Sequence, residues 1–188
     1  MQYSRHLLIL DGFVVLGQHI LLSLSVLVVG AGGIGTTLVL FLAASGVGRI
    51  TVMDHNDVKL SNLHSQVIHT EGRRGTSKAR SARDDMRALN PTVSVTAVIE
   101  PLNWDKDMEL LRGNDCVVDT SDNPRKMYLI NNICVLAEKE PKTAAMTNGS
   151  GGVPTPMVNN SAIGTEGQLT VYNHWGGEGV LTLHIPQA

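Results

Sequence analysis

The chain has 188 residues, a formal net charge of −2, 43% hydrophobic and 17% charged residues, a composition typical of a globular protein and not of a disordered tail. The length suggests one domain. The small net charge gives no strong field to hold a polyanion, which argues against nucleic acid as the partner.

The cysteines and the apolar segments favour the cytosol. Cys116 and Cys134 form no Cys-x-x-Cys pair, so we expect small buried thiols and no disulfide framework or cysteine-built zinc site. The apolar run 20–29 is shorter than the about 20 residues that span a bilayer, and no charged segment with a cleavage site precedes it. We therefore expect a cytoplasmic protein without a signal peptide or membrane association.

The first half of the sequence alternates strands with helices. Its patterns are an apolar run bounded by glycine, small and apolar helical positions that end at Gly46, and an amphipathic helix stopped by Asn90-Pro91. In chain order we expect a docking helix within 1–24, a strand at 26–29, a helix at 36–45, a strand at 49–54, a helix at 77–89 and a strand at 93–99.

The second half begins in the same way and then changes. We expect a helix at 105–112, a strand at 115–119, a helix at 125–138 with Pro124 at its start, and two later antiparallel strands at 168–173 and 180–185. The Gly-, Thr-, Pro- and Asn-rich segment 139–156 predicts a mobile loop or insertion. The predicted fold class is α/β: a Rossmann-like, doubly wound, mainly parallel sheet with later antiparallel strands.

A glycine-rich loop follows the first predicted strand. Gly30, Gly32 and Gly35 form the pattern G-x-G-x-x-G, with Gly33 inside it, and a helix is expected directly afterwards. Glycine permits a tight turn and lets backbone N–H groups approach a phosphate, while the helix dipole favours the anion. We interpret the loop as a phosphate-binding turn; the alternative is a merely tight connection between strand and helix.

Asp54 ends the second predicted strand, about twenty residues beyond the loop. An acidic residue at this place can accept hydrogen bonds from ribose hydroxyls, which favours an adenosine without a 2′-phosphate. This pattern does not separate NAD from ATP. A strand-end aspartate that starts a turn is the alternative.

Charged residues further along favour ATP. Lys78 opens a helix and can reach phosphates as a point charge, although the basic run around it is equally well explained as a solvated helix start. Asp122 follows the fourth strand at the carboxyl edge of the sheet, where a carboxylate facing a triphosphate can hold Mg²⁺. The alternative for Asp122 is a helix N-cap before Pro124, and one residue can serve both roles.

Together these residues resemble the MoeB/ThiF family, adenylyltransferases related to ubiquitin-activating enzymes, and within it the eukaryotic branch that activates small sulfur-carrier, ubiquitin-like proteins. The similarity covers nearly the whole chain, in many ordered matches. It is carried by residues 3–6, 28–35, 46–48, 54 with 60–63, 75–79, 89–91, 119–123 and 166–168.

The resemblance implies adenylation of the C-terminal glycine of a Gly-Gly-ended, ubiquitin-like partner, with ATP and Mg²⁺ as cofactors and pyrophosphate as a product. It implies that Asp54 holds the ribose, that Asn62 and Lys78 contact the phosphates, and that Asp122 positions Mg²⁺. It also implies that Arg5 enters the site of the neighbouring subunit in a symmetric homodimer.

One departure lies within the implied site. The family run Asn-Leu-x-Arg-Gln reads Asn-Leu-His-Ser-Gln at 62–66, so Ser65 replaces an arginine that faces the triphosphate. Losing such a cation costs on the order of 10²-fold in rate if it stabilises the transition state. Arg73 and Arg74 are candidates to supply the missing charge.

Two further departures lie in the second half. After 176–179 the chain lacks the first Cys-x-x-Cys of the family's zinc site, and it ends before the second pair and before the usual sulfur-transfer or thioester cysteine. We therefore expect no structural zinc and assign neither cysteine a catalytic role. The segment 139–156 interrupts the family pattern, which resumes at 156–159. The expectation is a single adenylation domain, truncated at its C-terminus.

Two other functions stay open on the sequence alone. One is a binding module of the same fold with weak or absent catalysis, which Ser65 and the missing cysteines favour and which Lys78, Asp122 and Arg5 oppose. The other is an NAD-dependent oxidoreductase, which is less favoured because no His or Tyr–Lys arrangement supplies an acid for hydride transfer.

Overall fold

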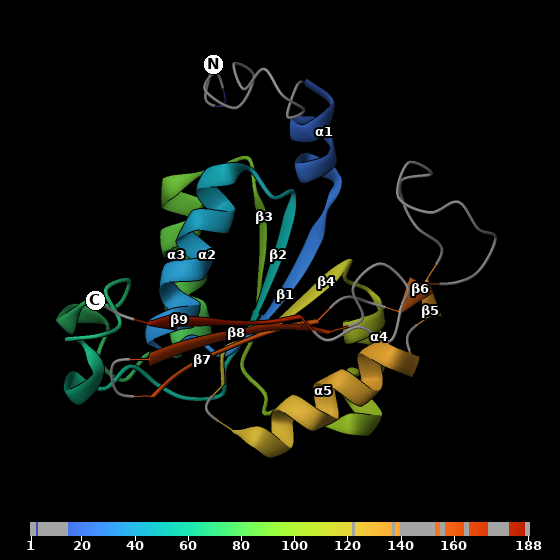
Figure 1. Ribbon diagram of the computed structural model, residues 1–188. Coiled ribbons are helices and arrows are strands. Elements are labelled where there is room, and N and C mark those ends of the chain that lie inside the picture. The colour runs from blue at the N-terminus through green and yellow to red at the C-terminus, as the bar shows by residue number, and fades with distance from the viewer. Residues whose placement is uncertain are drawn as a thin grey trace. The chain divides into compact units, whose positions relative to one another are not determined.

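A computed structural model describes Tyr3 and residues 15–121, 123–136, 138–139, 153–154, 157–163, 166–172 and 181–186. The chain divides into two compact units, Met1–Pro101 and Leu102–Ala188. Each unit is described by itself, with its elements labelled as in Figure 1.

Three short parallel strands form the centre of the first unit, in the order β3-β2-β1. They are β1 (Ser25–Val29), β2 (Arg49–Met53) and β3 (Ser94–Val98), and every residue of β1 is buried. Helices α2 (Gly33–Ser45) and α3 (Lys78–Leu89) contact each other and these strands, and α1 (Val15–Ser23) precedes β1 (Figure 1). The predicted alternation of strand and helix is confirmed here.

Helix α2 begins three residues earlier than its predicted start. The first helical turn is made by the glycine loop itself, with Gly32 at the N-cap position. Glycine has a low helix propensity, so the sequence pattern placed the start after the last glycine of the loop. The consequence is that part of the loop presents a helix N-terminus.

Two glycines shape the connection from α2 to β2. Gly46 ends the helix in the left-handed region, at φ 82°, and its N–H donates to the carbonyl of Ala43. Gly48 lies so close to the end of α1 that an added Cβ would stand 1.8 Å from the carbonyl oxygen of Leu22. Its N–H donates to the carbonyl of Leu21 at 3.0 Å, which positions the start of β2 against α1.

The segment between β2 and α3 is irregular but hydrogen-bonded. It contains two 3-10 turns, Leu60–Asn62 and Glu71–Arg73, and an antiparallel bridge from Asp57 to Ser77. The N–H of Lys78 donates to the carbonyl of Asn56 at 3.0 Å. The start of α3 is therefore held beside the end of β2.

The second unit combines two helices with a meander of strands. They are α4 (Trp104–Arg112), β4 (Cys116–Asp119), α5 (Pro124–Leu136), β7 (Met157–Ile163), β8 (Glu166–Tyr172) and β9 (Leu181–Pro186). Strand β4 pairs with β7 in parallel, and β7, β8 and β9 pair in antiparallel order. The predicted antiparallel character of the last strands is confirmed.

Three details of this unit correct the sequence prediction. Helix α5 ends at Leu136 and not at 138. The segment 139–156 is not wholly irregular, because β5 (Glu138–Lys139) and β6 (Val153–Pro154) pair in antiparallel order; residues 140–152 lie outside the described part. Strand β7 was not expected because polar residues occupy its middle, and its pairing with β4 and β8 overrides their low strand propensity.

The fold is the predicted Rossmann-like α/β class, with parallel βαβ units followed by antiparallel strands. Among the described residues, no helix has both the length and the apolar character needed to cross a membrane.

Candidate functional site

The glycine loop is held by hydrogen bonds on both of its sides. Gly30 has φ 105°, a conformation that glycine adopts without strain, and its N–H donates to the carbonyl of Met53 at 2.8 Å. The next residue, Ala31, is buried, and its N–H donates to Oδ2 of Asp54 at 2.7 Å. The loop is therefore fastened to the end of β2.

The loop leaves backbone donors available at the start of α2. The N-cap is Gly32, which has no side chain to accept from the first helical turn. Within the described residues, no acceptor is hydrogen-bonded to the N–H of Gly33 or Ile34. A Cβ at Gly32 would meet nothing within 4 Å, so the space in front of this turn is open. Free donors at a helix N-terminus favour an anion.

Asp54 lies beside this turn with 8% of its surface exposed. Its Oδ2 accepts from Ala31 and its Oδ1 accepts from the N–H of Asn56 at 2.8 Å. The carboxylate of Asp54 therefore fixes the glycine loop, a structural role that the sequence did not predict. Each carboxylate oxygen has two lone pairs, so one acceptor site on each remains for a hydroxyl group.

Lys78, the first residue of α3, is buried, with 6% of its surface exposed. Among the described residues, the ammonium of Lys78 has neither a hydrogen-bond acceptor nor an ion-pair partner. The two ion pairs of this part of the chain are Arg73–Asp85 and Arg83–Asp84. The stem of Lys78 is buried, but its Nζ is not among the buried, unpartnered side-chain atoms of the described residues, so the ammonium keeps contact with water and is available to an anion.

Asn62 and Ser65 lie on the segment that follows β2. The backbone carbonyl of Asn62 accepts from the N–H of Ser65 at 3.2 Å, and its Oδ1 accepts from the hydroxyl of Ser61 at 2.9 Å. Its amide N–H₂ group has no acceptor among the described residues. A Cβ on Gly33 would stand 3.3 Å from the carbonyl oxygen and 3.9 Å from Oγ of Ser65, so Ser65 borders the glycine loop.

Arg73 does not supply the charge that Ser65 lacks. Its two terminal nitrogens, at 2.5 and 2.6 Å, bind both oxygens of Asp85, and Nη1 also donates to Ser81. The hydrogen bond to Asp85 raises the pKa of Arg73. This bidentate pair occupies the guanidinium, whereas the side chain of Arg74 is exposed and has no partner among the described residues.

His69 belongs to the site, although the sequence analysis did not select it. The residue is 4% exposed; Nε2 lies 3.4 Å from the carbonyl oxygen of Ala31 and Nδ1 lies 2.9 Å from Oγ of Ser81. Lys78 and Asp54 are both close enough to influence it electrostatically. A lone histidine in an irregular segment carries no sequence signal for these contacts.

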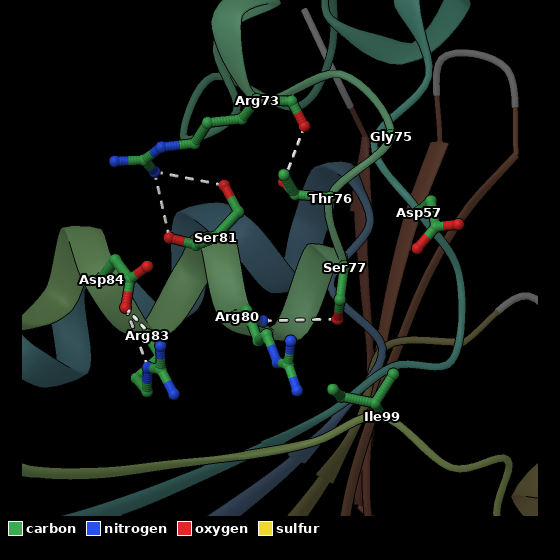
Figure 2. A pocket seen from close by; sticks show the side chains of 10 residues that line it. All are labelled: Asp57, Arg73, Gly75, Thr76, Ser77, Arg80, Ser81, Arg83, Asp84 and Ile99. Atoms are coloured by element: carbon green, nitrogen blue, oxygen red, sulfur yellow. Dashed lines mark hydrogen bonds and ion pairs between the residues drawn. The ribbon is translucent and has the colours of Figure 1, made fainter.

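A polar pocket of about 560 Å³ opens beside the first turn of α3 (Figure 2). Arg73, Arg80 and Arg83 line it together with Asp57 and Asp84. The glycine loop, Asp54 and Lys78 do not line it, so it is distinct from the predicted phosphate site. Two of its arginines form ion pairs, Arg73 with Asp85 and Arg83 with Asp84, as expected for a solvated helix start.

In the second unit, β4 ends at a buried aspartate. Oδ1 of Asp119 accepts from the N–H and the hydroxyl of Ser121 at 2.9 and 2.7 Å. Helix α5 is capped by Asn123, whose Oδ1 accepts from the N–H of Arg125 at 3.0 Å. The capping role that the sequence allowed for Asp122 thus falls to its neighbour; Asp122 itself and Arg5 lie outside the described residues.

The structure therefore brings together four of the predicted features within the first unit. The glycine loop, Asp54 and the start of α3 with Lys78 are joined by the contacts of Ala31 and Asn56, and Asn62 lies on the segment that borders Gly33.

The sequence profile described as the ThiF family matches residues 3–184. Among curated proteins, the Adenylyltransferase and sulfurtransferase MOCS3 of Arabidopsis thaliana is 44% identical over 176 residues, which are 94% of this chain and 34% of that protein. MOCS3 of Mus musculus is 44% identical over 177 residues, with 94% and 35% covered. The chain thus spans about a third of the length of these relatives.

Solved structures of E. coli MccB are also similar to this chain. E. coli MccB with ATP is 26% identical and superposes with a TM-score of 0.71, over 89% of this chain and 47% of MccB. E. coli MccB with selenomethionine MccA is 25% identical, with a TM-score of 0.75 over 90% and 46% of the two chains.

Proposed function

We propose that this chain, which belongs to the ThiF family, uses ATP to adenylate the C-terminal glycine of a ubiquitin-like sulfur-carrier protein. The observation that carries the proposal is the glycine loop with free N–H groups at the start of α2, together with Lys78, whose ammonium has no partner among the described residues. The names of the MOCS3 relatives support adenylyl transfer, and the MccB complex supports ATP as a ligand of this fold.

In the proposed reaction, a carboxylate oxygen of the partner's terminal glycine attacks the α-phosphorus of ATP. The bond from this phosphorus to the bridging oxygen of the β-phosphate breaks, pyrophosphate leaves with the electron pair, and an acyl-adenylate forms. Such a transfer depends mainly on positioning and on neutralisation of the developing charge. Lys78 and the N–H groups of Gly33 and Ile34 are suited to neutralise phosphate oxygens.

The other proposed roles follow the same chemistry. The remaining lone pairs of Asp54 would accept from the ribose hydroxyls, and the free amide donors of Asn62 would contact a phosphate oxygen. Arg5 would enter the site of a second copy of the chain, which makes a homodimer the proposed assembly.

Mg²⁺ is the metal that this reaction would use. Magnesium is commonly held by one or two carboxylates together with substrate phosphates and water, so a single carboxylate from Asp122 fits its donor preference. When bound, the ion would neutralise phosphate oxygens and shield the leaving pyrophosphate.

ATP–pyrophosphate exchange tests the proposal. With a ubiquitin-like protein ending in Gly-Gly, the wild-type chain should return labelled pyrophosphate into ATP, and only when that partner is present. Lys78→Ala and Asp122→Ala should each abolish exchange, while Lys59→Ala, at an exposed lysine, should retain it. Full activity in either site variant would refute its assignment.

The binding module without catalysis is the second candidate, and Ser65 favours it. In that case the chain would bind ATP, measured by calorimetry, but give no exchange at saturating partner. That pair of results would overturn the enzymatic proposal while leaving the nucleotide site intact.

A further inference from the structure

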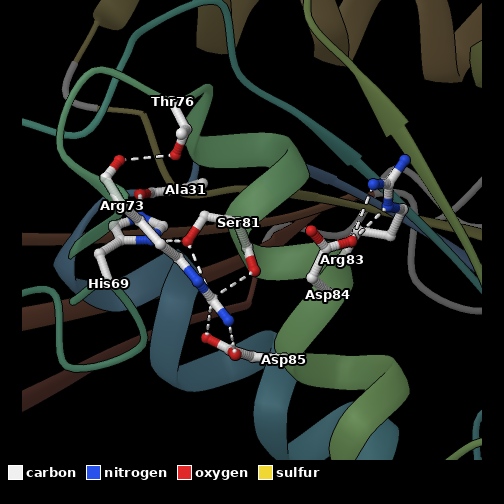
Figure 3. Close-up of polar contacts among 8 residues, drawn as sticks. All are labelled: Ala31, His69, Arg73, Thr76, Ser81, Arg83, Asp84 and Asp85. Carbon is white, nitrogen blue, oxygen red and sulfur yellow. Dashed lines mark hydrogen bonds and ion pairs between the residues drawn. The ribbon is translucent and has the colours of Figure 1, made fainter.

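A chain of hydrogen bonds joins α3 to the glycine loop through His69 (Figure 3). At one end, Asp85 holds Arg73, whose Nη1 donates to Oγ of Ser81 at 3.1 Å. Oγ of Ser81 lies 2.9 Å from Nδ1 of His69, and Nε2 of His69 lies 3.4 Å from the carbonyl oxygen of Ala31. The chain thus runs from an ion pair to the peptide at the middle of the loop.

The chemistry of the members fixes the direction of the protons. Arginine can only donate, and a backbone carbonyl can only accept. Ser81 has one hydroxyl proton, which can be donated to Nδ1 while Oγ accepts from Arg73. His69 then carries its proton on Nε2 and donates it to Ala31, so the chain is complete only with a neutral ring in this tautomer.

A second proton on His69 would lie on Nδ1. Oγ of Ser81 could accept it together with the proton of Arg73, so only the serine hydroxyl would lose its acceptor and the contact of Nε2–H with Ala31 would remain. Burial lowers the pKa of His69, and the nearby Lys78 lowers it further, while the hydrogen bond to Ala31 and the carboxylates of Asp85 and Asp54 act in the opposite direction. The net shift is downward, so the fold favours the neutral form.

The contact with Ala31 determines where a loop donor points. The carbonyl of Ala31 and the N–H of Gly32 belong to one trans peptide, in which they point in opposite directions. Gly30 and Gly32 flank Ala31 and lack a Cβ that would restrict rotation of this peptide. His69 restrains the carbonyl, and thereby the direction of the Gly32 N–H.

We propose that His69 is a positioning residue whose Nε2–H orients the Ala31–Gly32 peptide for a nucleotide phosphate. The inference rests on the proposed function, in which the loop binds the phosphates of ATP. Asp54 cannot take over this contact, because it binds only the N–H of Ala31 and not its carbonyl.

Two amide variants separate the contact from the titration. A glutamine places its amide nitrogen near the position of Nε2, so His69→Gln should keep the donor to Ala31 without titrating. An asparagine reaches only to the position of Nδ1, so His69→Asn should leave the carbonyl of Ala31 without its donor. His64→Gln is the matched control, because His64 is an exposed histidine on the same segment.

The affinity for Mg–ATP is measured by calorimetry at about pH 8, above the usual histidine range. The wild type, His64→Gln and His69→Gln should bind with similar affinities, because each keeps the donor to Ala31. His69→Asn should bind roughly tenfold more weakly than the wild type. Equal affinities for the wild type and His69→Asn, or equal losses in His69→Gln and His69→Asn, would overturn the proposal.

An NMR titration without nucleotide makes the two proposals separately testable. The ring nitrogens of His69 should report the Nε2–H tautomer, and the amide signal of Gly32 should titrate with His69 in the wild type but not in His69→Gln. A wild type that binds no ATP but shows this coupling would refute the proposed function alone. An Nδ1–H tautomer, or a Gly32 signal insensitive to His69, would refute the positioning role.

Discussion

Replacing Lys78 with methionine separates the stability of the fold from its binding of a nucleotide. Lys78 is buried, and its ammonium has no partner among the described residues. Methionine keeps the unbranched stem and removes the charge. We expect Lys78→Met to be about as stable as the wild type in the absence of ligand and to bind ATP poorly.

The change in stability follows from which part of the side chain is buried. The stem of Lys78 is buried, but its Nζ is not among the buried, unpartnered atoms of the described residues, so removing the charge relieves little desolvation. We expect the free energy of unfolding to change by less than about 1 kcal/mol. For a chain of this size, each kcal/mol raises the melting temperature by roughly 2–4 °C.

The effect on binding is larger. A charge-assisted hydrogen bond to a phosphate contributes about 1.5–3 kcal/mol, so Lys78→Met should weaken ATP binding by roughly 10- to 100-fold. A ligand at a hundred times its dissociation constant stabilises the native state by about 2.7 kcal/mol. At the same ATP concentration the variant should keep only about 0.4–1.4 kcal/mol of this stabilisation.

Thermal unfolding with and without Mg–ATP measures both effects in one series. Without ATP the two proteins should melt within a few degrees of each other, and with ATP the wild type should gain clearly more than the variant. Lys59→Met is the matched control at an exposed lysine and should keep the full ATP-dependent shift. A Lys78→Met protein that keeps the full ATP-dependent shift would refute the reasoning.

Three further predictions concern the neighbouring features. Ser65→Arg should raise the rate of ATP–pyrophosphate exchange by up to about 10²-fold, because Ser65 borders Gly33. Val67→Arg adds the same charge at an exposed position and should not raise the rate. Equal exchange rates for Ser65→Arg and the wild type would contradict the placement of Ser65. Gly48→Ala should lower the free energy of unfolding in urea by about 3 kcal/mol or prevent folding, since its Cβ would lie 1.8 Å from a backbone oxygen. Gly72→Ala should be nearly neutral, because a Cβ there would meet no atom within 4 Å. A stable Gly48→Ala protein would show that the close approach of Gly48 to Leu22 is wrong. Because the pKa of His69 is lower in the folded than in the unfolded chain, the unfolded chain binds the extra proton first as the pH falls. The stability contributed by neutral His69 should thus be present above about pH 6.5 and decline below it, and urea unfolding of His69→Gln should lack that decline.

Local signals in the sequence were sufficient for the core of the first unit. An apolar run, a glycine pattern and an amphipathic helix predicted β1, α2 and α3 because each depends on neighbours only a few residues away. The position of Lys78 beside the loop followed from the known geometry of such folds. What the sequence could not show was that the lysine is buried without a partner.

The contacts that the sequence missed are all long-range. His69 meets Ser81 across 12 residues and Ala31 across 38, and no periodicity links these positions. Strand β7 likewise depends on its partners, since its own middle residues are polar. The sequence offered Asp122 as an alternative cap of α5, whereas the structure shows Asn123 accepting from the N–H of Arg125, since both residue types are good caps and the backbone path decides between them.

The double restraint of Ala31 has a thermodynamic consequence for any ligand of the loop. Its N–H is fixed by Asp54 and its carbonyl by His69. A loop that is preorganised in this way has little conformational entropy left to lose on association. Nucleotide binding to the wild type should accordingly carry a smaller entropic penalty than binding to a variant in which either restraint is removed, and fast association without a preceding loop rearrangement is its kinetic counterpart.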